Sequence, residues 1–135
     1  MKNLFTLSFL PRSYNLALLI LRLWFGFSLF LKHGWEKITG FSQMIPHFPD
    51  PIHIGPVPSF AFALFSDAIC SLLLFFGLAT RWAALIIAIN TGVAFALVHR
   101  FRFFGQGNGE LPWLYFAAAF AVLIAGPGRF SFDGK

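Results

Sequence analysis

The chain has 135 residues, of which 58% are hydrophobic and only 11% are charged, and its mean hydropathy is +0.74. Soluble domains carry about 25% charged residues, so a soluble fold of this length could not bury so much apolar surface. The composition excludes an ordinary soluble domain and favours an integral membrane protein with the lipid bilayer as its partner. The net charge of +5 comes from Lys and Arg residues scattered singly between apolar runs. No basic stripe is present for a phosphate backbone, so we predict no nucleic-acid partner.

Four apolar segments are each long enough, with their flanking residues, to cross a hydrocarbon layer of ~30 Å. They cover residues 14–33, 59–79, 82–99 and 111–126. The turn between the second and third segments is very short, so these two must form an antiparallel hairpin. We therefore predict an all-α fold, an integral membrane four-helix bundle with four transmembrane helices, as a single domain over residues 1–135. Four spans place both termini on one side, and the slight excess of basic residues there favours the cytoplasm.

Residues 39–58 are predicted to form a loop, because five prolines interrupt any regular helix there. The loop is long for a connection between two helices, which indicates a functional cap or lid. A plain connector is an equally good reading of the same residues. The single cysteine, Cys70, excludes an intrachain disulfide and a CxxC motif.

Three polar residues lie near the middle of the predicted spans: Arg22 in the first, Asp67 in the second and Asn90 in the third. A charge at the bilayer centre costs ~2.5–3.5 kcal/mol on insertion scales, so such residues rarely face lipid. We expect Arg22 and Asp67 to form a buried ion pair, with Asn90 as a further partner. The pair has two readings that the sequence leaves open: it fixes the register of the helices, or it is functional.

A second polar layer is predicted at the membrane surface opposite the termini. It contains His33, Trp35, Lys37, His99 and Glu110. Histidine carries protons near neutral pH, and a His/Lys/Glu group beside aromatic rings suits a quinone head group, a small anion or proton transfer. The two histidines lack HxxxH or HExxH spacing, so we assign no metal site. A haem or a metal ion held by His33 and His99 stays open, and no catalytic residue is assigned.

Four motifs occur in an order that resembles a known family. They are Arg22 followed by HGWEK at 33–37, Asp67 followed by LLLFFGLATR at 72–81, the glycine-rich loop 105–110 ending in Glu110, and GPGRFSFD at 126–133. Together they resemble the DoxX family of small four-helix membrane proteins over nearly the whole chain. The chain departs from the family's pattern in two respects: Asp67 stands where the family often has Glu, and the proline-rich loop is enlarged.

The resemblance implies four spans in the bacterial inner membrane with cytoplasmic termini, and it implies a redox setting, because the family includes a thiosulfate:quinone oxidoreductase subunit. The chain itself has no dinucleotide fingerprint and no CxxCH haem motif, so no cofactor is bound covalently and the expected carrier is a quinone. We expect a quinone-linked subunit that works with a redox enzyme. The alternatives are a non-enzymatic scaffold for such an enzyme and, more remotely, a small transporter, which would need a homo-oligomer.

Overall fold

The structure is a computed structural model that describes residues 1–134, and these residues are helical wherever they form regular structure. Three of the short segments, η1, η3 and η4, are π-helical, and η2 is a 3₁₀ turn. In chain order the elements are α1 (Lys2–Phe5), α2 (Tyr14–Leu29), η1 (Phe30–Gly34), α3 (Trp35–Met44), η2 (Ile45–His47), α4 (Pro56–Leu64), η3 (Phe65–Cys70), α5 (Ser71–Phe76), α6 (Thr80–Val93), η4 (Ala94–Val98) and α7 (Glu110–Ala125).

These segments join into three continuous helices that are long and apolar enough to cross a membrane. They run over Tyr14–His47, Pro56–Phe76 and Thr80–Val98, with 34, 21 and 19 residues. The fourth apolar helix, α7, has 16 residues, which is just short of the ~17 residues that a perpendicular span needs. The predicted all-α membrane fold is therefore confirmed, whereas the fourth span stays a prediction.

The first helix extends well beyond the predicted end at residue 33. It continues through α3, with one kink at Gly40, and stops only where Pro46 enters η2. The expectation of a loop from residue 39 was wrong for its first part, because no proline occurs before Pro46. At the other end of this loop, Pro56 and Pro58 lie in the first turn of α4, where a missing backbone donor costs little.

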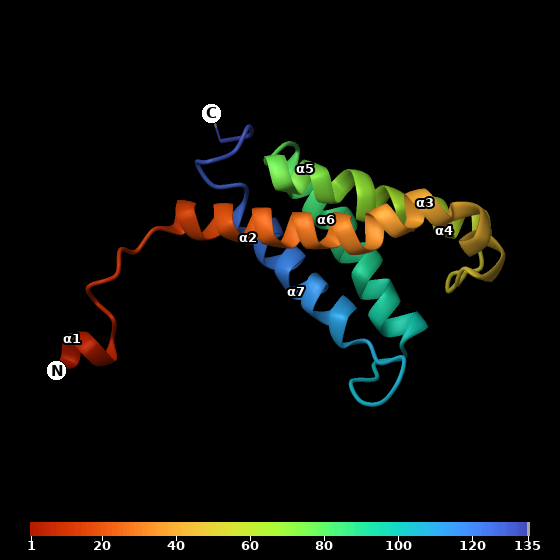
Figure 1. The fold of residues 1–135 in the computed structure, drawn as a ribbon, viewed down its shortest axis with the longest axis horizontal. Helices are drawn as coiled ribbons and strands as arrows, with labels where there is room; N and C mark the ends of the chain where they lie inside the picture. Colours follow the sequence, from red (N-terminus) through yellow and green to blue (C-terminus); the bar gives the residue numbers. More distant parts are fainter. Residues whose placement is uncertain (135) are drawn as a thin grey trace.

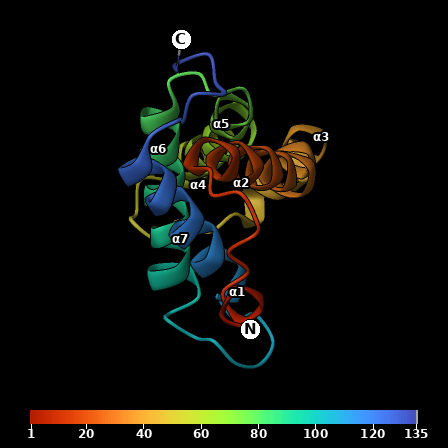
Figure 2. The same ribbon diagram turned by 90° about the vertical axis from the view of Figure 1, so that its left-hand side faces the viewer.

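The long helices form two antiparallel hairpins (Figure 1). In the first hairpin, α2 lies along α5; in the second, α6 lies along α7. The two hairpins cross steeply, as both ribbon views show (Figures 1 and 2). They share a core of large residues from four helices, Phe25, Leu29, Leu74, Ile87 and Val122, with alanines between them.

Two glycines set how closely the first hairpin packs. A Cβ atom on Gly26 would lie 2.8 Å from the carbonyl oxygen of Ser71, and one on Gly34 would lie 2.5 Å from that of Asp67. Where no hydrophobic effect drives helices together, small residues allow this close approach. Gly34 therefore places η1 directly against η3 at the level of Asp67.

Candidate functional site

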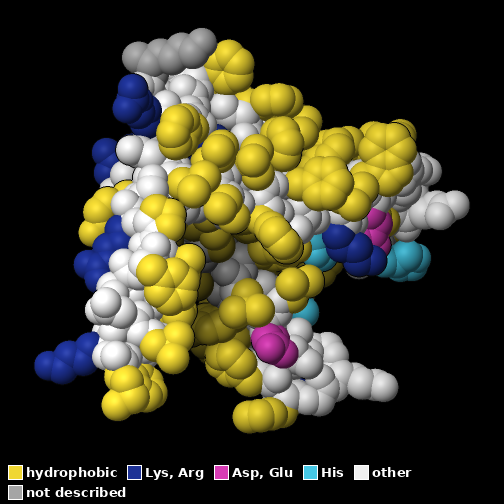
Figure 3. Space-filling model, turned by 60° about the vertical axis from the view of Figure 1, so that its left-hand side comes forward, with side chains coloured by type: hydrophobic (Ala, Val, Ile, Leu, Met, Phe, Trp, Pro, Cys, Tyr) yellow, Lys and Arg dark blue, Asp and Glu magenta, His cyan; other side chains and the backbone are white. Residues whose placement is uncertain are grey.

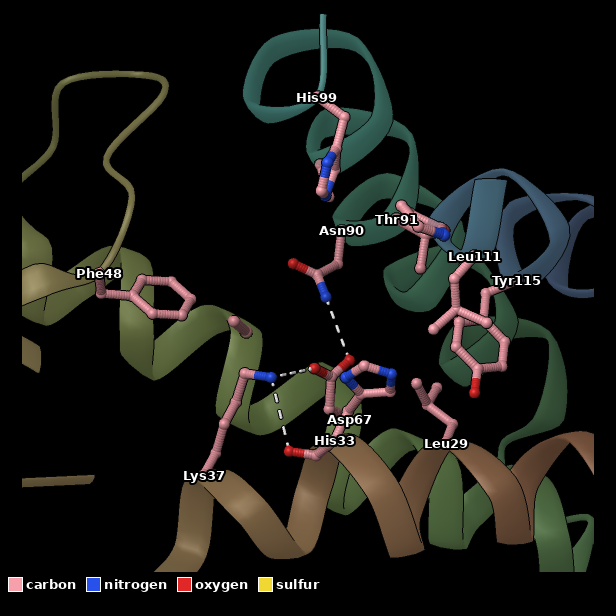
Figure 4. A pocket seen from close by; sticks show the side chains of 13 residues that line it. Leu29, His33, Lys37, Phe48, Asp67, Asn90, Thr91, His99, Leu111 and Tyr115 are labelled. Atoms are coloured by element: carbon pink, nitrogen blue, oxygen red, sulfur yellow. Dashed lines mark hydrogen bonds and ion pairs between the residues drawn. The ribbon is translucent and has the colours of Figure 1, made fainter. Parts of the chain in front are cut away.

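A polar cavity of about 220 Å³ lies between the two hairpins (Figure 4). Figure 3 shows a surface that is largely hydrophobic and hollowed, with histidine side chains at the edge of the hollow. The polar residues that line the cavity are His33, Lys37, Asp67, Asn90, Thr91 and His99. Leu29, Ala63 and Tyr115 are among its apolar and aromatic walls. The cavity thus gathers ionisable groups within helices that are mostly apolar.

Asp67 is the centre of the hydrogen bonding in this cavity. One carboxylate oxygen accepts an ion-paired hydrogen bond from Lys37 Nζ at 2.7 Å, and the other accepts one from Asn90 Nδ2 at 3.2 Å. The Lys37 and Asp67 side chains are only 9% and 8% exposed. A buried pair of this kind holds its geometry firmly, because loss of either partner leaves an uncompensated charge.

The expected ion pair between Arg22 and Asp67 is not formed; Lys37 takes that place. Arg22 instead donates to the carbonyl oxygens of Leu74 and Phe75 at 3.2 and 3.3 Å, at the end of α5, and to that of Phe130. The prediction failed because it took the first helix to end at residue 33. The helix continues to His47, so the residue level with Asp67 is Gly34, about 18 Å farther along the axis than Arg22. The expected contact between Asn90 and Asp67 is present.

Two histidines enter the cavity from opposite hairpins. The side-chain Nε2 of His33 is buried and has no hydrogen-bond partner within residues 1–134, and its ring meets that of Tyr115 edge-on at 5.6 Å. The Nδ1 atom of His99 lies 2.8 Å from the carbonyl oxygen of Gly107. A carbonyl only accepts, so His99 carries its proton on Nδ1, and its neutral form keeps a lone pair on Nε2.

The other two residues of the predicted outer layer lie elsewhere. Glu110 and Trp35 are exposed and do not line the cavity. Glu110 begins α7, and its position in the first turn suits the helix dipole. The structure therefore brings His33, Lys37 and His99 together with Asp67 and Asn90, and it separates Glu110 and Trp35 from them.

The three π-helical segments all border the cavity, contributing His33 from η1, Asp67 from η3 and Ala94 from η4. A π turn inserts an extra residue into a helix and often occurs at functional sites. Sequence reasoning gave no signal for these turns. It also missed Tyr115 and Phe48, because aromatic residues are too common in this chain to mark a site, and it missed Thr91, which lies among small residues of the third predicted span.

The proline-rich loop is tied down beside the cavity. The Asp50 carboxylate accepts hydrogen bonds from Ile54 N, Gly55 N and Ser59 Oγ, all between 2.8 and 2.9 Å. Desolvation acts to raise the pKa of Asp50, but these hydrogen bonds outweigh it and lower that pKa below its ordinary value. The fastened loop presents Phe48, whose ring meets Phe60 edge-on at 5.2 Å, to the cavity.

Within residues 1–134 no group of three or more His, Cys, Asp or Glu side chains is arranged to hold a metal ion. His33 and His99 line the same cavity, but its volume of about 220 Å³ is below the ~300–1,000 Å³ typical of pockets for drug-sized ligands.

The model of the DoxX family matches residues 17–100. The chain belongs to the DoxX family. A protein of Haemophilus influenzae, described only as an uncharacterized protein, is 32% identical over 125 residues, which cover 88% of this DoxX chain and 82% of that relative. No solved structure matches. All polar residues that line the cavity fall inside the matched segment, whereas Tyr115 and the rest of α7 lie beyond it.

Proposed function

We propose that this DoxX membrane protein binds the head group of a quinone in the polar cavity and serves as the quinone-linked membrane subunit of a redox enzyme. The observation that carries the proposal is the cavity itself. It places His33, whose buried Nε2 has no hydrogen-bond partner among the described residues, beside a neutralised ion pair among membrane helices. Contacts that only hold helices together do not require an open cavity, whereas a small polar ligand does.

The charge balance of the cavity supports a neutral head group over a small sulfur oxyanion. Lys37 supplies a positive charge, but Asp67 lies 2.7 Å away and cancels most of it. An anion entering the cavity would also meet the carboxylate. A quinone carries no net charge, and its two carbonyl oxygens accept hydrogen bonds from Lys37 or a histidine N–H.

The two histidines suit the protons that quinone chemistry needs. Reduction of a quinone to a quinol takes two electrons and two protons, and His33 and His99 are the proton carriers that line the cavity. The electrons must come from a redox centre in a partner protein, because the chain has no dinucleotide or c-type haem motif. Within this proposal α7 completes a fourth span, with the chain in the bacterial inner membrane and both termini in the cytoplasm.

The test is a binding titration of the purified protein in detergent with a short-chain benzoquinone, together with analysis of the quinones that co-purify. We expect saturable binding, and binding at least about tenfold weaker for His33→Ala, which removes one polar partner of the head group. Glu110→Ala is the matched control, because Glu110 is exposed and outside the cavity. A protein that carries no quinone and binds none would overturn the proposal. If it also retained a stoichiometric partner, it would be a scaffold.

A further inference from the structure

A second cavity, of about 190 Å³, lies under the proline-rich loop. Its walls are almost entirely apolar and come from the loop, from α4 and from the end of the third long helix. The residues that line this cavity alone include Pro51, Ile54, Phe62, Val93 and Val98. Nothing in the polar network around Asp67 depends on these residues, so their arrangement needs an explanation of its own.

The apolar cavity lies next to the polar one. Phe48, Ala63, Asn90 and Ala94 line both. Two of these four residues are alanines, so the wall that the two cavities share carries small side chains there. Asn90 stands at the junction: its Nδ2 donates to Asp67 in the polar cavity, and its side-chain oxygen points toward Phe48 in Figure 4.

The sizes of the two cavities indicate one ligand that occupies both. Each cavity is below the ~300 Å³ at which pockets for drug-sized molecules begin, whereas the two together fall inside that range. The two cavities also differ in the chemistry of the side chains that line them. One offers an ion pair and histidines, and the other offers aliphatic and aromatic side chains. This is the pattern of an amphiphile with a compact polar head and an apolar chain.

We propose that the apolar cavity is the binding site for the hydrocarbon tail of the ligand whose head group occupies the polar cavity. The tail is an alkyl or isoprenoid chain that passes Ala63 and Ala94 and leaves along Val93 and Val98 beneath the loop. This inference rests on the proposed quinone site and adds a recognition element to it. The proline-rich loop, which hydrogen bonds to Asp50 hold in place, then covers the tail site.

The experiment compares a benzoquinone that carries a ten-carbon alkyl tail with the same ring without the tail, as ligands of the full-length protein in detergent. Val98→Phe adds a large ring at a position that lines the apolar cavity and not the polar one. Val57→Phe is the matched control, because Val57 is 60% exposed and lines neither cavity. Val93→Phe repeats the test from a different position, in case Val98→Phe does not fold.

We expect the wild-type protein to bind the tailed quinone more tightly than the tailless one. Filling the apolar cavity should abolish this preference by weakening binding of the tailed quinone about tenfold, with tailless binding unchanged, because an overfilled cavity excludes the chain. Val57→Phe should behave as wild type. Equal affinities of both quinones for wild type, or a preference that survives both filling variants, would overturn the tail site and leave the head-group site standing. Failure of both quinones to bind would overturn the proposed function, and the tail site with it.

Discussion

Two charged clusters occupy this apolar chain, and they differ in what surrounds them. In the first, the Arg22 cluster, the Arg22 guanidinium donates to three carbonyl oxygens of α5 and of the C-terminal segment. Packing there is tight, because a Cβ atom on Gly77 would lie 2.6 Å from Arg22 Nη1. In the second, the Asp67 cavity, the ion pair and the His33 side chain border open space.

The comparison shows that a charge within a membrane helix does not by itself mark a site. Arg22 joins α2 to the end of α5, and Asp133 joins the C-terminal segment to the start of α6 through Ala79 N and Thr80 N at 3.0 and 2.7 Å. Both sets of hydrogen bonds hold separate segments of the fold together. The Lys37–Asp67 ion pair also holds helices together, but it borders a cavity with room for a ligand. Variants of each cluster should therefore separate stability from binding.

The largest effect is expected for Asp67→Ala. The change leaves the Lys37 ammonium buried without its partner, which costs ~3–5 kcal/mol of stability. Thermal unfolding in detergent and membrane yield measure the loss. Wild-type stability of this variant would show that the ion pair is not formed in the membrane.

Arg22→Leu should cost somewhat less, about 2–3 kcal/mol, because charged hydrogen bonds to three carbonyl groups are lost at one end of the bundle. The same unfolding assay applies. The variant protein that does fold should bind a short-chain quinone as wild type does, since Arg22 does not line the polar cavity. Weakened quinone binding by the folded variant would contradict the division between the two clusters.

Gly34→Ala tests the close packing that positions Asp67. Its new methyl group would meet the carbonyl oxygen of Asp67 at 2.5 Å, so we expect a loss of about 1–3 kcal/mol and weaker quinone binding. Gly40→Ala is the matched control, because the nearest atom to its Cβ is the Met44 sulfur at 3.7 Å. Equal behaviour of both variants would show that η1 and η3 do not pack as described.

The smallest expected effect is that of replacing Asp133, which should change the stability of the protein and the dependence of that stability on pH. Desolvation acts to raise the pKa of Asp133, but hydrogen bonds from Thr80 and Ala79 and the nearby Arg22 charge outweigh it and lower that pKa. A lowered folded-state pKa contributes stability that is present above the unfolded value of ~3.9 and is lost as the pH falls through the folded value. Asp133→Ala should cost ~0.5–2 kcal/mol at pH 7, because it removes the side-chain oxygens that accept from Ala79 N and Thr80 N at the start of α6. Its unfolding temperature should depend less on pH below 4 than that of wild type, and an equal dependence would contradict the role of the cap.

The sequence predicted the helical membrane class and the association of Asn90 with Asp67, because hydropathy and rough depth are local properties. The partner of Asp67 was missed, since depth depends on where the first helix ends, and the segment after His33 contains no breaker before Pro46. The spacing of four residues between His33 and Lys37 was a signal in the sequence that both side chains lie on one face of a helix. Phe48 and Tyr115 could not be predicted, because only the tertiary fold distinguishes them from the lipid-facing aromatic residues.

The most direct test of the central claim uses the double variant Lys37→Met/Asp67→Leu. Replacing a buried ion pair with apolar residues of similar volume is often neutral for stability, so the protein should unfold as wild type does. Titration with a short-chain quinone should then show binding at least about tenfold weaker, because the polar partners of the head group are gone. A double variant that is equally stable and binds the quinone with wild-type affinity would contradict the assignment of the Asp67 cavity as the binding site.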